Sequence, residues 1–155
     1  EVPSLLNLYS FIKSTIFRRL TFHFKYNNAP ELQDLLEKAK DPQKNPHLKT
    51  MEGFLDHARR INPAAAESAG RVLAGFRFLI VVNRVMKPAD ANAGEVVQNL
   101  LRQYLSIGNS VTMTIREDPA IRSSMTKLTP IMLDNPSSMF CRDIVQIAMR
   151  LFSKG

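Results

Sequence analysis

Apolar residues recur every three or four positions along most of this chain, which is the spacing of an amphipathic α-helix. The first such stripe lies between Pro3 and Leu20 and consists of Leu5, Tyr9, Ile12, Ile16 and Leu20. Comparable stripes predict further helices over residues 30–40, 51–61, 92–107, 119–129 and 136–151. A longer helix is predicted from Pro63 to about Met86, because alanines follow its start and its second half is apolar on most sides.

Five Asp-Pro or Asn-Pro dipeptides punctuate these stripes, at residues 41–42, 45–46, 62–63, 118–119 and 135–136. A short polar side chain at an N-cap accepts a hydrogen bond from the first turn, and a proline at the next position already has a helical φ. The last three dipeptides each precede an apolar stripe, so they predict helix starts. The first two lie four residues apart, so at least one of them belongs to a proline-rich loop near residues 41–50.

Three segments have patterns that fit a strand as well as a helix. Residues 21–26 alternate polar and aromatic side chains, and residues 111–115 alternate apolar side chains with threonine. We interpret residues 21–26 as a helix end or an extended connector, because no convincing partner strand lies nearby, and residues 111–115 stay open between the two structures. The β-branched run at residues 80–82 also favours a strand, but the clear helix start at residues 62–63 outweighs it.

Together these elements predict an all-α fold, either a single compact bundle or an orthogonal array of about seven helices. The length of 155 residues is about that of one domain, and a hydrophobic content of 45% is ordinary for a globular protein. We therefore predict a single all-helical domain over residues 1–155, and the absence of an initiator methionine is consistent with a fragment of a longer chain. No residue pattern recurs at a fixed period, which argues against a helical solenoid.

The formal net charge of +7 is the main indication of function in the composition. Twelve arginines outnumber nine lysines, and guanidinium groups bind phosphate and carboxylate bidentately. Net charge bears on partners and solubility rather than on fold. The composition therefore favours an anionic partner.

The residue types that usually carry catalysis are few and poorly spaced. The three histidines, His23, His47 and His57, include no pair at the i, i+4 spacing of a helical zinc site, and the single cysteine, Cys141, has no second thiol to join it. No Gly-x-x-x-x-Gly-Lys-Ser/Thr phosphate loop occurs. We expect no enzymatic activity, no catalytic residue, no metal, no cofactor and no small-molecule substrate.

Cationic side chains gather in three places along the sequence. The first thirty residues hold four cations against one carboxylate, with three aromatic residues interleaved between residues 22 and 26. Arg77 and Arg84 are seven residues apart, so both are expected on one face of the 63–86 helix, and Arg59 with Arg60 forms a third basic point. Cations beside aromatic rings can contact phosphates and stack on unpaired bases. The predicted nucleic-acid or anion-binding residues are Lys13, Arg18, Arg19, Lys25, Arg59, Arg60, Arg77 and Arg84.

These features predict a non-enzymatic helical binding domain whose cationic surface engages an anionic partner, with RNA or DNA preferred. The alternative is a helical scaffold or adaptor, of a viral structural or a regulatory kind, that binds protein partners or self-associates; seven methionines suit such adaptable surfaces. Binding to a membrane surface is a third alternative, disfavoured because the first stripe is no stronger than that of an ordinary bundle helix. The longest apolar run is too short to cross a bilayer and no signal peptide is visible, so an intracellular location, cytoplasmic or nuclear, is expected.

Overall fold

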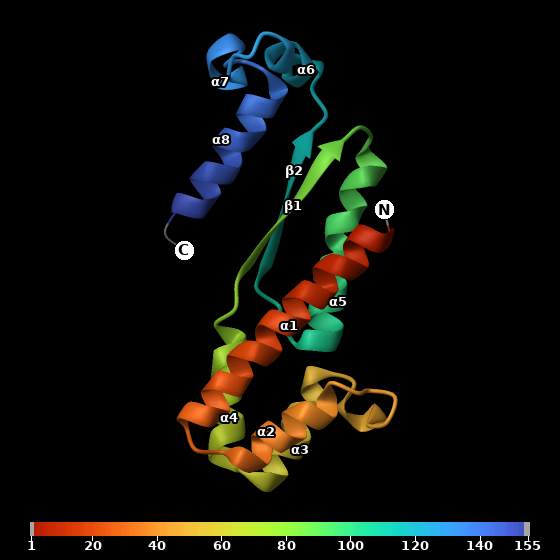
Figure 1. The fold of residues 1–155 in the computed structure, drawn as a ribbon, viewed down its shortest axis with the longest axis vertical. Coiled ribbons are helices and arrows are strands. Elements are labelled where there is room, and N and C mark those ends of the chain that lie inside the picture. The colour runs from red at the N-terminus through yellow and green to blue at the C-terminus, as the bar shows by residue number, and fades with distance from the viewer. Residues whose placement is uncertain (1, 154–155) are drawn as a thin grey trace. The chain divides into compact units, whose positions relative to one another are not determined.

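Helices dominate the computed structural model, which describes residues 2–153, and one pair of strands interrupts them (Figure 1). In chain order the elements are α1 (Val2–Tyr26), α2 (Pro30–Ala39), the 3-10 helix η1 (Pro46–Leu48), α3 (Met51–Ile61), α4 (Pro63–Ala74), β1 (Phe78–Val85), the 3-10 helix η2 (Pro88–Ala91), α5 (Asn92–Leu105), β2 (Ser110–Arg116), α6 (Pro119–Thr126), α7 (Ile131–Asp134) and α8 (Met139–Phe152). Within the described residues there are thus eight α-helices, against about seven predicted. The short α7 is the addition.

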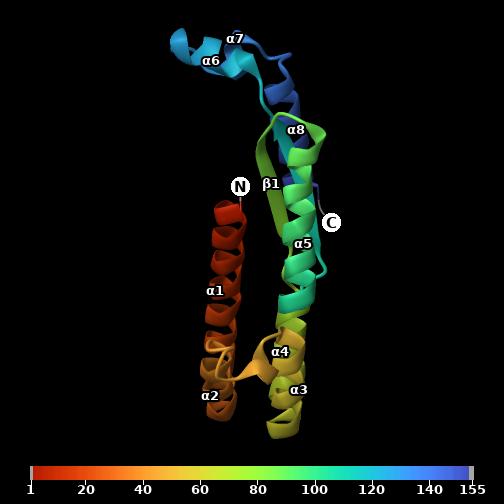
Figure 2. The ribbon, with the colours of Figure 1, turned by 90° about the vertical axis from the view of Figure 1, so that its right-hand side faces the viewer.

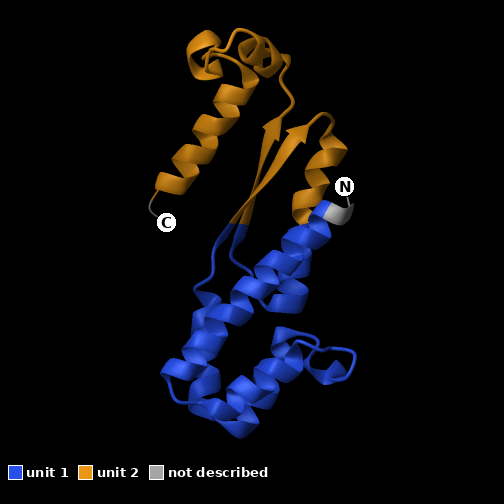
Figure 3. Cartoon of the chain, in the orientation of Figure 1, with its two compact units in different colours: residues 1–78, 96–110 blue, residues 79–95, 111–155 orange. Residues whose placement is uncertain are grey.

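The chain divides into two compact units (Figure 3). Unit 1 comprises residues 1–78 and 96–110, and unit 2 comprises residues 79–95 and 111–155. Whether the two units make up the single domain that the length favours stays a prediction. Each unit is described by itself below.

The first four helices of unit 1 close a ring of contacts. Helix α1 packs against α2 and α4, and α3 packs against the same two helices. Figure 2 shows the result as two layers, with α1 and α2 in one and α3 and α4 in the other. The predicted helices over residues 30–40 and 51–61 are confirmed as α2 and α3, and the proline-rich segment between them forms turns and η1.

Polar caps begin two of these helices. Thr50 Oγ1 accepts a hydrogen bond from the Gly53 N–H at 3.1 Å, and Asn62 Oδ1 accepts one from the Ala65 N–H at 3.1 Å. The side-chain amide of Asn62 also donates to Glu31 Oε1 on α2, at 2.7 Å. The helix start predicted at residues 62–63 is therefore confirmed, and the same cap links α4 to α2.

Helix α1 continues through the alternating segment at residues 21–26. Ile16, Leu20 and Phe24 are fully buried at a spacing of four residues, and the Phe24 ring packs on Phe54 of α3 with 6.2 Å between centroids. A spacing of four keeps these side chains on one helix face, whereas a strand would place Phe22, Phe24 and Tyr26 together. The helical interpretation of this segment is therefore the correct one.

The prediction of one helix from residue 63 to residue 86 is wrong beyond Ala74. The chain leaves the helix at Gly75, and β1 forms in place of the second half. Strand β1 pairs in parallel with β2, through hydrogen bonds from the Phe78 N–H to the Asn109 carbonyl (3.1 Å) and from the Glu117 N–H to the Val85 carbonyl (3.0 Å). Parallel pairing needs a long crossover, which here contains η2 and α5. The fold is therefore mostly α rather than all-α.

The parallel pairing also explains one glycine. Gly94, in the first turn of α5, is buried, and a Cβ atom there would overlap the side chain of Thr112 on β2. The close approach of helix and strand at this point in unit 2 therefore requires a residue without a side chain.

Buried aspartates organise the helices of unit 2. Asp118 caps α6 by accepting from the Ala120 N–H at 2.9 Å, and it also accepts from the Phe140 N–H of α8 at 3.0 Å. This confirms the helix start predicted at residues 118–119. The start predicted at residues 135–136 is wrong, because α8 begins at Met139, where Ser138 Oγ accepts from the Cys141 N–H at 3.2 Å.

A second buried carboxylate joins α8 to the end of β2. Asp143, which is 5% exposed, binds the Arg116 guanidinium bidentately, at 3.0 Å from Nε and 2.6 Å from Nη2, and also accepts from the Arg116 N–H at 2.9 Å. Hydrogen bonding by Arg116 is the main reason that the pKa of Asp143 lies below its ordinary value. The backbone N–H of Phe140, followed by that of Ala120, lowers the pKa of Asp118 in the same way.

Because of these two carboxylates, we expect the fold of unit 2 to be sensitive to acid. Their stabilising effect is complete above the ordinary aspartate pKa of 3.8 and is lost as the pH falls from there through the lowered folded-state values. We expect the single thiol, that of the buried Cys141, to react faster with a dithiodipyridine reagent as the pH decreases through this window. In the Asp143→Asn variant the acid dependence should be smaller, whereas equal profiles for the variant and the unchanged chain would contradict the assignment.

No helix in the part of the chain that the structure describes is both long enough and apolar enough to cross a bilayer.

Candidate nucleic-acid interface

The exterior of α1 carries cations that form no ion pair with any described carboxylate. This helix of 25 residues contains no aspartate or glutamate, and it holds four of the eight predicted binding residues. Arg18, Arg19 and Lys25 are exposed and Lys13 is half-buried. None of the four forms an ion pair within 4.0 Å with a carboxylate of the described residues. Their charges are therefore free to meet a ligand.

Aromatic rings lie among these cations on the same helix. The Arg18 guanidinium lies 5.8 Å from the centroid of the Phe22 ring, and the Lys13 ammonium lies 5.4 Å from that of Phe17. Phe22 is 55% exposed and Tyr26, four residues later, is 90% exposed. Residues four apart share a helix face, so both rings are offered to solvent on one side. We call Lys13, Arg18, Arg19, Phe22, Lys25 and Tyr26 the α1 surface.

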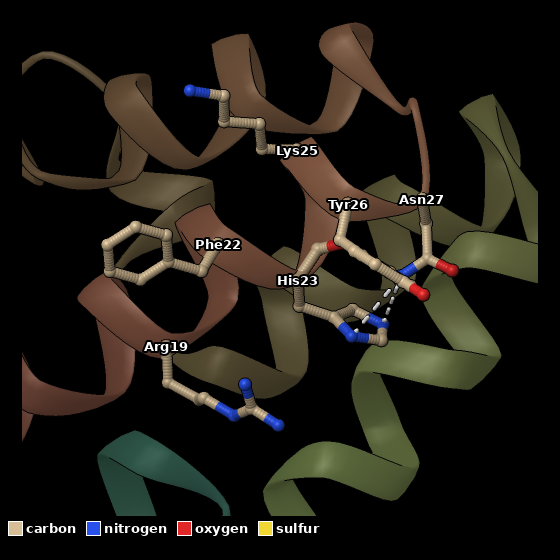
Figure 4. A pocket seen from close by; sticks show the side chains of 6 residues that line it. All are labelled: Arg19, Phe22, His23, Lys25, Tyr26 and Asn27. Carbon is tan, nitrogen blue, oxygen red and sulfur yellow. Dashed lines mark hydrogen bonds between the residues drawn. The ribbon is translucent and has the colours of Figure 1, made fainter.

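Two open depressions in unit 1 meet at Phe22. The first has a volume of about 840 Å³ and is lined by residues at the end of α1 and just after it, among them Arg19, Lys25 and Tyr26 (Figure 4). In Figure 4 the Phe22 ring lies between the side chains of Arg19 and Lys25. The second, of about 560 Å³, has Lys13 and Arg18 in its lining together with Glu37, whose carboxylate is paired with Lys40. A flat ligand resting on Phe22 would therefore have cations on either side.

His23 faces the first depression as a neutral polar group. Burial, followed by repulsion from Arg19 and Arg71, lowers the pKa of His23 below 6.5, so the imidazole is uncharged at neutral pH. Its Nδ1 lies 3.3 Å from the side-chain amide of Asn27. At neutral pH this histidine supplies hydrogen-bonding capacity rather than charge.

Four of the predicted residues lie outside α1. On α3, Arg59 forms an ion pair with Asp56 at 2.6 Å, and Arg60 is exposed with no carboxylate partner among the described residues. Both occupy the last turn of α3, where cations interact favourably with the helix dipole. Part of the role of this pair is therefore structural.

The expectation that Arg77 and Arg84 share one helix face is wrong. The predicted helix ends before either residue; Arg77 lies in the connection before β1, and Arg84 lies near the end of β1. They belong to different units, and Arg84 donates through Nε to Glu117 at 3.0 Å. Because β1 forms in place of the second half of the predicted helix, the two arginines no longer lie on a common helix face.

The sequence pattern missed one cation beside the site and included one ring that is not available. Arg71 of α4 lines a small depression together with Arg19, although it is also paired with Glu67 at 2.7 Å. Phe24, interleaved with the cations in the sequence, is fully buried. The spacing of four from Leu20 to Phe24 was the signal that could have separated Phe24 from the two exposed rings.

The histidines and the cysteine form no metal or catalytic cluster among the residues that the structure describes. The rings of His47 and His57 lie 4.6 Å apart, although they are ten residues apart in the sequence. Within the described residues, no group of three histidine, cysteine or acidic side chains is placed to hold a metal ion. Cys141 is buried, with its thiol 3.4 Å from the Asn135 carbonyl.

Comparisons with protein-family models, with curated proteins and with solved structures find no match for this chain. The function is therefore inferred from the chemistry of the site.

Proposed function

We propose that this protein is a non-enzymatic binder of single-stranded nucleic acid, RNA or DNA, and that it binds through the α1 surface. The observation that carries the proposal is the combination of unpaired cations and exposed rings on one acid-free helix. Phosphates would meet Arg18, Arg19 and Lys25, and unpaired bases would stack on Phe22 and Tyr26. Stacking needs bases that are not already in a duplex, which favours single strands over double strands.

The dimensions of the surface suit a short segment of strand. From Arg18 to Tyr26 the helix rises about 12 Å, at 1.5 Å per residue. A stacked strand advances about 3.4 Å per nucleotide, so roughly three or four nucleotides fit along it. This is close to the smallest site sizes found for single-strand binding modules.

Salt dependence tests the proposal. With three or four phosphates contacted, the logarithm of the association constant should fall with the logarithm of salt concentration with a slope of about −2 to −3. Fluorescence anisotropy of a labelled uridine oligonucleotide, titrated at several salt concentrations, measures this slope. A duplex of equal length should bind more weakly. Absence of binding at low salt, or tighter binding of the duplex, would contradict the proposal.

Self-association as a scaffold is the second candidate, and apolar side chains exposed in unit 2 favour it. On α8 the exposed fractions of Val145, Met149 and Phe152 are 45%, 67% and 85%. Their spacings of four and three place them along one side of the helix. If the oligonucleotide does not bind and light scattering shows a molecular mass that rises with concentration, the scaffold function replaces the first proposal.

A further inference from the structure

A further depression, within unit 2, lies at the carboxyl ends of the two parallel strands. It has a volume of about 840 Å³, and its lining includes Arg84 near the end of β1, Glu117 directly after β2 and Arg122 on α6. Both strand arrows in Figure 1 point toward this end of unit 2, where β2 leads into α6. In open parallel sheets ligands bind outside the carboxyl ends of the strands, where the following loops converge.

The backbone of Arg84 is in an unusual conformation for a residue with a side chain. Among the described residues, four that are not glycine have a positive φ: Asn28, Arg84, Ser106 and Leu128. Asn28, Ser106 and Leu128 each lie one or two residues after the end of a helix, where a residue in the left-handed conformation commonly terminates the helix. Arg84, with φ of 58°, lies within β1 and has no such reason. Strained residues of this kind cluster at ligand sites.

Local hydrogen bonds hold this conformation and aim the guanidinium. Asn83 Oδ1 accepts from the Arg84 N–H at 2.9 Å, and Arg84 Nε donates to Glu117 Oε2 at 3.0 Å. The two Nη groups of Arg84 form no hydrogen bond with the described residues, and the Arg122 side chain forms neither a hydrogen bond nor an ion pair with them. The carboxylate of Asp118 is already occupied by the N–H groups of Ala120 and Phe140. Glu117 accepts from Arg84 through Oε2 and keeps Oε1 free, so among the described residues of the lining the free donors outnumber the free acceptors.

Apolar side chains form the other part of the lining. Ile121 and Phe140 are half-buried, and Met125 is 70% exposed. These side chains can pack on a flat ring system, and methionine sulfur makes favourable contacts with aromatic rings. Two guanidinium groups and the side-chain NH₂ group of Asn83 offer more donors than the two oxygens of a carboxylate can accept, and the three oxygens of a phosphate monoester match these donors better.

We propose that this depression binds a phosphate monoester carried on a planar apolar body, of the chemical class of a nucleoside monophosphate. The phosphate contacts Arg84 and Arg122, and the planar group packs on Met125 and Phe140. The site lies wholly in unit 2, and it stands whether or not α1 binds nucleic acid. The same chemistry is offered by a free mononucleotide and by the 5′-phosphate end of a strand.

Calorimetric titration of the full chain with AMP, adenosine and inorganic phosphate tests this proposal. We expect saturable binding of AMP, with adenosine and inorganic phosphate each at least tenfold weaker. Arg122→Gln should weaken AMP binding at least tenfold. Arg84→Gly should do the same without lowering the thermal midpoint, because glycine accepts the positive φ that arginine does not favour. Arg142→Gln, an exposed arginine of unit 2 outside the depression, should leave AMP binding unchanged.

Several outcomes would overturn the assignment: no heat with AMP, equal binding of AMP and adenosine, equal binding of AMP and inorganic phosphate, or unchanged AMP binding in both arginine variants. Displacement of AMP by a 5′-phosphorylated oligonucleotide, but not by its 5′-hydroxyl form, would assign the site to strand ends. No displacement by either oligonucleotide would assign it to free mononucleotides. Loss of oligonucleotide binding in the Arg18→Glu/Arg19→Glu variant with AMP binding retained would separate this site from the α1 surface.

Discussion

Replacing Phe24 with alanine is expected to lower the free energy of unfolding of unit 1 by about 3–5 kcal/mol. Phe24 is fully buried where α1 meets α3, and its ring packs on Phe54. Truncation removes that packing and leaves a cavity that the two helices can fill only in part. All three tyrosines of the chain, Tyr9, Tyr26 and Tyr104, belong to unit 1, so urea denaturation followed by tyrosine fluorescence reports on this unit alone.

Phe22 provides the matched control for this prediction. It is the same residue type two positions away, but 55% of its surface is exposed. Phe22→Ala should change the free energy of unfolding by less than about 0.5 kcal/mol. Equal losses in the two variants would mean that residues 21–26 place both rings on one face, as a strand would, and the helical assignment would be wrong.

Reversing the charges of Arg18 and Arg19 together is expected to weaken binding of a single-stranded oligonucleotide about 30- to 100-fold near 0.1 M salt. The Arg18→Glu/Arg19→Glu variant loses two phosphate contacts. It also places two carboxylates, which repel phosphate, beside the remaining lysines. The salt slope should become shallower by about 1.4, since each single-strand contact contributes about 0.7. Anisotropy titrations at several salt concentrations measure both quantities.

A control variant for this charge reversal must change the net charge of the chain by the same amount at residues outside the α1 surface. Arg102 on α5 and Arg150 on α8 are exposed and have no carboxylate partner among the described residues. Arg102→Glu/Arg150→Glu should reduce affinity less than threefold. If both double variants lose affinity to the same extent, net charge and not the α1 surface controls binding, and the site is misassigned.

Local sequence signals were sufficient for elements that depend on neighbours along the chain. The helices α2 and α3 follow from their apolar stripes, and the caps at Asn62 and Asp118 follow from a polar residue before proline. The same signal gave a wrong helix start at Asn135-Pro136. Ser138 lies closer to the apolar stripe of α8, and its hydroxyl caps the helix instead.

The strand pair depended on a contact that no local window contains. The residue patterns at 80–82 and at 111–115 each favour a strand only weakly, and neither segment has a possible partner strand close to it in the sequence. Pairing them brings together residues about thirty positions apart, and the favourable hydrogen bonding of that ladder then outweighs helix propensity beyond Ala74. Once β1 forms, Arg77 and Arg84 cannot share a helix face.

The α1 surface was predictable in composition but not in arrangement. Lys13, Arg18, Arg19 and Lys25 could be identified because no carboxylate interrupts the sequence from Val2 to Tyr26. Which rings are exposed could not be decided before residues 21–26 were known to be helical. Helical geometry buries Phe24 and leaves Phe22 and Tyr26 beside the cations.

Tryptophan fluorescence at position 22 reports directly whether bases stack on the α1 surface. The chain has no tryptophan, so Phe22→Trp introduces a single indole on the α1 surface, and Phe152→Trp, at an 85% exposed position on α8, serves as the control. Stacking of bases on the indole predicts quenching at position 22 that saturates together with oligonucleotide anisotropy and disappears at high salt, with little change at position 152. Saturable oligonucleotide binding with unchanged fluorescence at position 22 would contradict base stacking on the α1 surface.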